Sequence, residues 1–299
     1  MTKTKFYESV AESVSEVLGS EVIVEIQEVT KVNLSLDGLT IRKRNESIAP
    51  TIYLNQYFNQ FNDGRTMDDI VKDIIRVYEN NQPENIMDVF KTEDFYDFDK
   101  MKEKIVLKVI NTERYLDLLE QVPHLDMEGL GLSVVFYVSI MTGEQSAGIL
   151  IKNEHLRLWE KKVSDLTSLA EINTNRMHAF TIKSINEVLS GMFGFEEDLI
   201  PEDVPALYVL TDGNKRFGAS QLYLKNKIRE FAEKNDCDVY ILPSSVHELL
   251  LLRADFPNIE PEHLKQMVCE VNSTEVSDED FLCDGAFKYI LAEDKIIAL

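Results

Sequence analysis

Hydrophobic and polar positions along the chain follow two spacings, one typical of helices and one typical of strands. Apolar residues spaced three and four positions apart predict helices from Phe6 to Leu18 and from Leu224 to Ala232. Short apolar runs bounded by turn residues predict strands at 132–140, 207–210, 239–242 and 287–291, and alternation predicts a half-exposed strand at 22–29. Residues 105–110 and the four leucines at 249–252 are further apolar runs. Because helices and strands are interspersed, we expect an α+β fold, with mixed or antiparallel sheets and helices packed on one face.

Residues 206–253 hold the densest set of these signals. The strand at 207–210 stops at Asp212-Gly213-Asn214, residue types that tolerate a left-handed backbone and favour a turn. A helix follows and ends at Asn235-Asp236, and the next strand is broken by Pro243. This order predicts a sheet with a helix over one face.

Turn and capping signals organise the first half of the chain. Asp37-Gly38 lies between two alternating runs, which predicts a hairpin turn there. Thr66 and Asp69 have the spacing of a capping box at a helix start. Pro123 and the glycines at 129 and 131 indicate loops, so we place a boundary between an N-terminal α+β lobe of residues 1–121 and a C-terminal α+β lobe of residues 122–299. A single domain is the alternative.

The charge of the chain restricts its partners. Its 31 basic and 53 acidic residues give a net charge of −22, which repels phosphate backbones and anionic lipids. The basic run Arg42-Lys43-Arg44 has no aromatic platform beside it and is interpreted as a solvated strand end. We therefore expect neither nucleic-acid nor membrane binding, whereas a protein partner and any oligomeric state remain open.

Cysteine use and the N-terminus indicate a cytoplasmic protein. The three cysteines lie far apart and form no CxxC pair, which fits free thiols in a reducing compartment. The first twenty residues carry several glutamates and no apolar core of a signal peptide. No apolar run has the length needed to cross a bilayer.

Four segments resemble a known family. They are LTIRKRNESIAPTIYLNQYFNQF (39–61), LKVINTERYLDLLEQVPH (107–124), DVYILPSSVHELLLL (238–252) and VCEVNSTEVSDEDFL (268–282). In this order they resemble a family of bacterial proteins, common in anaerobic Firmicutes, known only as a domain of unknown function. The resemblance spans nearly the whole chain and implies one full-length unit in a bacterial cytoplasm. It implies no activity, cofactor or catalytic residue.

Common catalytic motifs are absent from the sequence. It contains no P-loop, no GxGxxG after a strand and no GxSxG. His247-Glu248 is followed by leucines rather than by the second histidine of a zinc motif, and none of the five histidines pair at helical spacing. We therefore assign no cofactor, metal site or catalytic residue.

One group of polar residues is a candidate ligand site. Loops at strand ends often carry binding groups, and the strand ending at Pro243 is followed by a hydroxyl, an imidazole and a carboxylate. The candidate residues are Ser244, Ser245, His247 and Glu248, joined by Asn173 and Arg176. Structural interpretations compete with this one: the serines could form a turn, and Asn173 and Arg176 could end a helix.

Two further polar pairs have the same ambiguity. Asp236 and Asp238 could bind a divalent cation, but they stand where a helix-to-strand turn is expected. Lys215 and Arg216 could bind phosphate, but they also suit an exposed hairpin tip.

Two functional hypotheses follow. The first is a non-catalytic cytoplasmic protein that acts through protein contacts, because no catalytic motif is recognised. The second is an enzyme or small-ligand binder with a polar site at strand ends near Ser244–Glu248. Convergence of polar groups around His247 would favour the second. Mimicry of DNA charge has little support, since the acidic residues are interspersed with basic ones.

Overall fold

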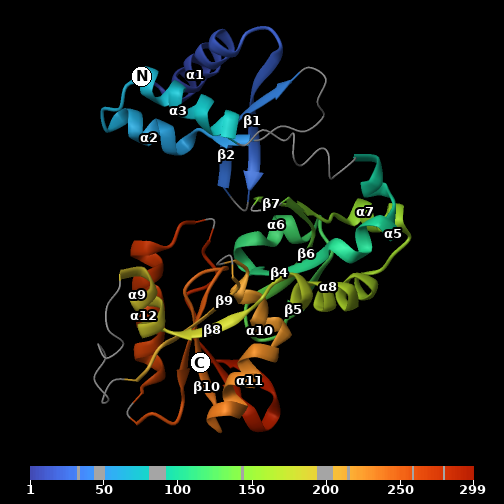
Figure 1. Ribbon diagram of the computed structural model, residues 1–299, viewed down its shortest axis with the longest axis vertical. Helices are drawn as coiled ribbons and strands as arrows, with labels where there is room; N and C mark the ends of the chain where they lie inside the picture. The colour runs from blue at the N-terminus through green and yellow to red at the C-terminus, as the bar shows by residue number, and fades with distance from the viewer. Residues whose placement is uncertain are drawn as a thin grey trace. The chain divides into compact units, whose positions relative to one another are not determined.

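The protein consists of two compact units. The computed structural model describes residues 1–31, 34–43, 51–80, 92–142, 145–193, 205–213, 216–257, 259–278 and 280–299. The N-terminal unit comprises residues 1–94 and 140–146, and the C-terminal unit comprises residues 95–139 and 147–299 (Figure 1). Helices are interspersed with three sheets of antiparallel strands, so the α+β prediction is confirmed. That residues 1–121 and 122–299 fold as separate lobes stays a proposal.

Among its described residues, the N-terminal unit packs three helices against a three-stranded sheet. Its elements are α1 (Lys3–Leu18), β1 (Val22–Lys31), β2 (Leu34–Lys43), β3 (Thr51–Tyr53), α2 (Asn55–Asn62) and α3 (Met67–Asn80), with strand order β1-β2-β3. The apolar face of α1 supplies Phe6 and Val10 to a core shared with Leu39 of β2 and Ile70 of α3. Thr66 forms the N-cap half of the predicted capping box, because its hydroxyl accepts the Asp69 N–H at 3.2 Å, and the same hydroxyl donates to the Asp69 carboxylate at 2.6 Å.

The hairpin turn predicted at Asp37-Gly38 is wrong. Both residues lie inside β2, where Asp37 pairs with Glu28 and Gly38 with Gln27 of β1. Tertiary contacts satisfy Asp37 in the extended conformation: its N–H donates to the Asn55 side chain at 3.1 Å, and its carbonyl accepts the Leu54 N–H at 2.9 Å. These contacts outweigh the local preference of Asp-Gly for a turn.

The first sheet of the C-terminal unit is built around one long strand. β6 (Leu132–Thr142), whose last residues belong to the N-terminal unit, pairs with β4 (Ile105–Asn111), β5 (His124–Met127) and β7 (Gln145–Leu150). The short helices nearby are η1 (Thr92–Tyr96), α5 (Phe98–Met101), η2 (Lys102–Lys104), η3 (Glu113–Tyr115), α6 (Leu116–Leu119) and α7 (Asn153–Trp159), and α8 (Val163–Met177) is longer. The helix predicted from residue 112 thus forms as η3 followed by α6.

Side chains satisfy the outer edge of β4. Leu107 donates its N–H to the Thr174 hydroxyl of α8 at 3.0 Å, and its carbonyl accepts from the Ser220 hydroxyl at 3.3 Å. An edge strand leaves backbone groups unpaired, and burying them without partners would cost free energy. Thr174 of α8 and Ser220 supply the missing partners, which accounts for polar side chains being buried at these two positions.

The second sheet of the C-terminal unit has the strand order β13-β12-β10-β11-β9-β8. Its strands are β8 (Thr181–Ser184), β9 (Tyr208–Thr211), β10 (Val239–Pro243), β11 (Leu249–Arg253), β12 (Phe287–Ile290) and β13 (Lys295–Ala298). The associated helices are α9 (Ile185–Phe193), η4 (Gly218–Ser220), α10 (Gln221–Leu224), α11 (Asn226–Asn235), α12 (Pro261–Glu275) and η5 (Leu291–Glu293). The three strands predicted after residue 206 are therefore present, the leucine run at 249–252 forms the additional strand β11, and β13 is also additional.

Helices lie on both faces of this six-stranded sheet, not on one face as the sequence predicts (Figure 1). Leu242 and Leu252 pack with Leu264 of α12 on one face. On the other face, the ring of Tyr208 lies 4.8 Å from that of Phe231 in α11. Strands buried on both faces are apolar at consecutive positions, which explains the four leucines of β11.

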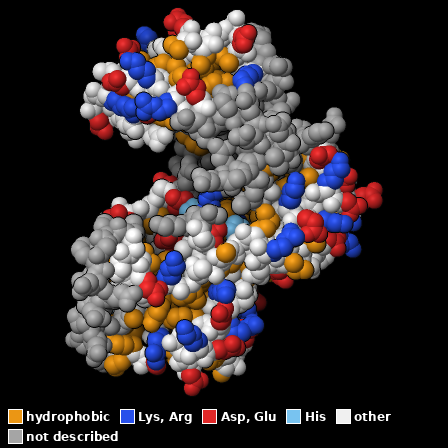
Figure 2. Space-filling model, in the orientation of Figure 1, with side chains coloured by type: hydrophobic (Ala, Val, Ile, Leu, Met, Phe, Trp, Pro, Cys, Tyr) orange, Lys and Arg blue, Asp and Glu red, His pale blue; other side chains and the backbone are white. Residues whose placement is uncertain are grey.

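Charges are mixed on the surface. Figure 2 shows acidic and basic side chains interspersed over the visible face, so the acidic excess is not gathered there into rows. Among the helices of the described ranges, none combines the length and apolar character that crossing a bilayer requires.

Candidate functional site

Two histidine–aspartate pairs lie on either side of one aromatic ring in the C-terminal unit. The ring of Phe217 is 5.2 Å from that of His178 and 5.9 Å from that of His247. His178 follows α8 and pairs with Asp212, which follows β9; His247 lies in the turn between β10 and β11 and pairs with Asp280. We call these five residues the Phe217 cluster.

The His178–Asp212 pair is buried and oriented. Nδ1 of His178 lies 2.7 Å from Oδ2 of Asp212, and the two side chains are 9% and 2% exposed. The other carboxylate oxygen of Asp212 accepts the Arg216 N–H at 2.6 Å. Because the carboxylate only accepts, Nδ1 of His178 is assigned as the donor, and in the neutral ring this assignment leaves the lone pair on Nε2. Nε2 forms no hydrogen bond with any described residue.

Both ring nitrogens of His247 form hydrogen bonds, and its surroundings favour the neutral ring. Its Nε2 lies 3.0 Å from Oδ1 of Asp280, and the N–H of Phe217 donates to its Nδ1 at 3.4 Å. Burial lowers the pKa of His247, and the charges of Lys108 and Arg216 act in the same direction against the opposing effect of Asp280. His247 is therefore better suited to holding Phe217 in place than to accepting a proton.

The backbone around Phe217 is constrained. Phe217 has φ +57, the left-handed region that a bulky side chain rarely adopts. A Cβ on the next residue, Gly218, would lie 2.5 Å from the carbonyl oxygen of His247 and 2.6 Å from that of Leu210. Only glycine allows this close approach, which brings Phe217 against both histidines.

The positive charges of the site come from Lys108 and Arg216. Nζ of Lys108 lies 5.8 Å from the centre of the Phe217 ring, and both cations act electrostatically on His247. Of the two residues predicted as a possible phosphate-binding pair, Arg216 lies beside this cluster. Its other member, Lys215, lies outside the described residues.

The serines predicted at the site form the turn that carries His247. The Ser245 hydroxyl accepts the N–H groups of His247 at 3.0 Å and Glu248 at 3.2 Å. The Ser244 hydroxyl donates to the Glu248 carbonyl at 3.1 Å. Ser244, Ser245 and Glu248 thus position His247, and their direct contact with a ligand stays a prediction.

Asn173 and Arg176 stabilise the segment before β4 and its first residue. Asn173 lies inside α8 and donates to the carbonyls of Lys102 at 2.8 Å and Ile105 at 2.9 Å. Arg176 donates to the Glu103 carboxylate at 3.0 Å and to the Asn173 side chain at 2.9 Å. These contacts give both residues a structural role, and their membership of the ligand site stays a prediction.

The sequence reasoning missed His178, Asp212, Phe217 and Asp280 as site residues. Each histidine is more than thirty residues from its aspartate, so no local spacing indicates the pairing. The available signal was Asp212 directly after a buried strand, a position where binding groups collect.

The Asp236–Asp238 segment is a turn. Asp236 ends α11 with φ +51, and Asp238 accepts the Leu291 N–H at 3.0 Å and pairs with Lys288 at 2.8 Å. Throughout the described part of the chain, no three His, Cys, Asp or Glu side chains are placed to hold a metal ion.

Comparison with known proteins gives one match. No curated protein and no solved structure matches the chain. Residues 3–290 match the pattern of a family of unknown function (DUF5688), and the chain belongs to this family. The expected resemblance to a family of unknown function is thereby confirmed, and an origin in Firmicutes stays a prediction.

Proposed function

We propose that this member of the family binds a small anionic ligand at the Phe217 cluster and that His178 accepts a proton there. The observation that carries the proposal is the buried His178–Asp212 pair, with Nε2 of His178 left without a partner in the described residues. This places the ligand site at the strand ends near Ser244–Glu248, as the second sequence hypothesis expected, with His178 rather than His247 as its reactive group.

The chemistry of the pair suits general base catalysis. Asp212 fixes the ring orientation and tautomer of His178 and would stabilise the imidazolium that forms when Nε2 takes a proton. Lys108 and Arg216 supply positive charge that would attract an anionic group to the cluster. The proton donor would be the ligand or a water molecule bound beside it.

Nitrogen-resolved NMR of the histidine rings, with inorganic phosphate as the anionic probe, tests this proposal. We expect neutral His178 to carry its proton on Nδ1, so that Nε2 shows the signal of an unprotonated ring nitrogen, and phosphate to shift the His178 and His247 rings. His263, an exposed histidine of α12, is the internal control and should not respond specifically. A protonated Nε2 on neutral His178 would overturn the base assignment. Equal phosphate responses of His178 and His263 would overturn the binding site.

A variant separates the two parts of the proposal. Lys108→Met removes one cation while leaving the His178–Asp212 pair intact, so it should weaken the phosphate response without changing the His178 tautomer. An unchanged phosphate response would contradict the role of Lys108.

Function through protein contacts is the second candidate. Met267 and Val271 are exposed one turn apart on α12, and paired apolar side chains on a helix surface favour contact with another protein. Replacing both with aspartate should abolish capture of a specific partner by the immobilised chain, and unchanged capture would contradict this surface. A cytoplasmic location is part of the same proposal.

A further inference from the structure

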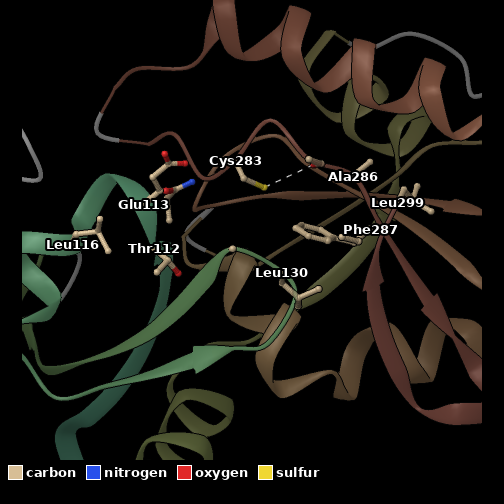
Figure 3. Close-up of a pocket in the computed structure, with 12 residues that line it drawn as sticks. Thr112, Glu113, Leu116, Leu130, Cys283, Ala286, Phe287 and Leu299 are labelled. Atoms are coloured by element: carbon tan, nitrogen blue, oxygen red, sulfur yellow. Dashed lines mark hydrogen bonds between the residues drawn. The ribbon is translucent and has the colours of Figure 1, made fainter.

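A cavity of about 450 Å³ lies in the C-terminal unit, apart from the residues of the Phe217 cluster. One side is formed by residues between 111 and 131, and the other by residues 283–299 (Figure 3). Its size falls within the range of small-molecule sites, which is roughly 300–1,000 Å³.

Most of the cavity wall is apolar. Leu130 belongs to the segment between residues 111 and 131, and Phe287 belongs to the segment 283–299. Leu116 also forms part of the wall, although its side chain is 58% exposed. Cys283 also lines the cavity, and its thiol donates to the Gly285 carbonyl at 3.8 Å (Figure 3). Burial raises the pKa of Cys283 to about 11, so the thiol is neutral at physiological pH. This wall favours an apolar body.

The polar edge of the cavity comes from residues 111–113. Asn111 donates to the Leu282 carbonyl at 2.9 Å and accepts the Arg114 N–H at 2.8 Å. The Thr112 hydroxyl lies 2.8 Å from that of Ser133. Glu113, by contrast, forms no hydrogen bond or ion pair with any described residue. Glu113 is exposed, and its carboxylate is the charged side-chain group at this edge.

We propose that this cavity binds a small amphipathic cation, with its apolar body between Leu130 and Phe287 and its protonated amine at Glu113. Charge complementarity selects the cation, because the charged side chain in the wall is a carboxylate and most of the remaining wall is apolar, with uncharged polar groups from Asn111 and Thr112 at its edge. The binding site does not depend on the Phe217 cluster, so each proposal can fail alone.

Three eight-carbon probes of different charge test the proposal on the full chain. n-Octylammonium, 1-octanol and octanoate would be titrated below their aggregation concentrations while the methyl signals of Leu116, Leu130 and Ala286 are followed by NMR. We expect n-octylammonium to bind about tenfold more tightly than 1-octanol, as one charge-assisted hydrogen bond would produce, and octanoate to bind least.

Two pairs of variants give the test its controls. Glu113→Gln should abolish the preference for n-octylammonium over 1-octanol, whereas Glu120→Gln, at an exposed position outside the cavity wall, should retain it. Leu116→Ser should weaken both probes severalfold, whereas Leu158→Ser, which alters a side chain that is 60% exposed on α7, should weaken neither.

Three results would overturn the proposal. Equal binding of octanoate and n-octylammonium, or a preference that survives Glu113→Gln, would overturn the cation assignment. Probe-induced shifts that do not include Leu130 and Ala286 would overturn the cavity as the binding site.

Discussion

Replacing Gly218 with alanine is expected to destabilise the C-terminal unit strongly. The added Cβ would lie 2.5 Å and 2.6 Å from the carbonyl oxygens of His247 and Leu210, so each must retreat by roughly 0.8–0.9 Å to restore ordinary contact. That movement would also stretch the hydrogen bond from the Gly218 N–H to the His247 carbonyl, now 2.9 Å long.

The expected loss can be worked from these two effects. Overpacking of a tight site costs about 1–3 kcal/mol, and weakening one buried hydrogen bond adds about 1 kcal/mol. The free energy of unfolding should therefore fall by about 2–4 kcal/mol in Gly218→Ala. Because the chain has a single tryptophan and Trp159 lies in the C-terminal unit, its fluorescence during urea unfolding measures this value.

Gly191→Ala is the matched control. Gly191 lies in α9, and an added Cβ would have nothing within 4 Å. Alanine is favoured over glycine inside a helix by about 0.5–1 kcal/mol, so this variant should be slightly more stable than the parent protein. If Gly218→Ala lost less than about 0.5 kcal/mol, the inferred close approach at Phe217 would be refuted.

Two further predictions concern pH. The ion pair with Arg229 holds the pKa of Asp294 at about 2. Above pH 4, Asp294→Asn should therefore lower the free energy of unfolding by about 1 kcal/mol. This value is reduced for solvent screening, because the carboxylate is 43% exposed. That difference should vanish as the pH falls from 4 towards 2 in urea titrations, and a constant difference would argue against the ion pair. Burial lowers the pKa of His247 in the folded protein. As the pH falls, the unfolded chain therefore binds a proton at His247 before the folded protein does. The parent protein should lose stability below about pH 6.5 for this reason. His247→Gln should lack this part of the pH dependence, and parallel profiles for the two proteins would contradict the assignment.

Strands of the six-stranded sheet can be predicted from sequence because their burial requires runs of apolar residues. β10 and β11 are apolar at consecutive positions because helices cover both faces of their sheet, and the strand predicted at 239–242 ends one residue before β10 does. Asp37-Gly38 shows the limit of local signals. Its turn preference is overridden by hydrogen bonds to Asn55 and Leu54, which lie more than fifteen residues away.

The candidate site was only partly predictable for the same reason. His247 stands at a strand end, where sequence reasoning looks for binding groups, but Asp280 reaches it from a loop beyond α12. His178 and Asp212 meet because the end of α8 lies beside the end of β9, a contact that no spacing along the chain reveals. Asn173 satisfies a carbonyl of β4, and because no local pattern indicates that this carbonyl lacks a strand partner, Asn173 resembles a ligand group in the sequence.

Each of the three sheets is drawn from one continuous stretch of chain. Their strands lie within residues 22–53, 105–150 and 181–298, so no strand of one sheet is interleaved with those of another. During synthesis, every strand of a given sheet leaves the ribosome before the first strand of the next. Pairing within the first sheet therefore need not wait for later sequence, which limits the time that its unpaired edges are exposed to other nascent chains.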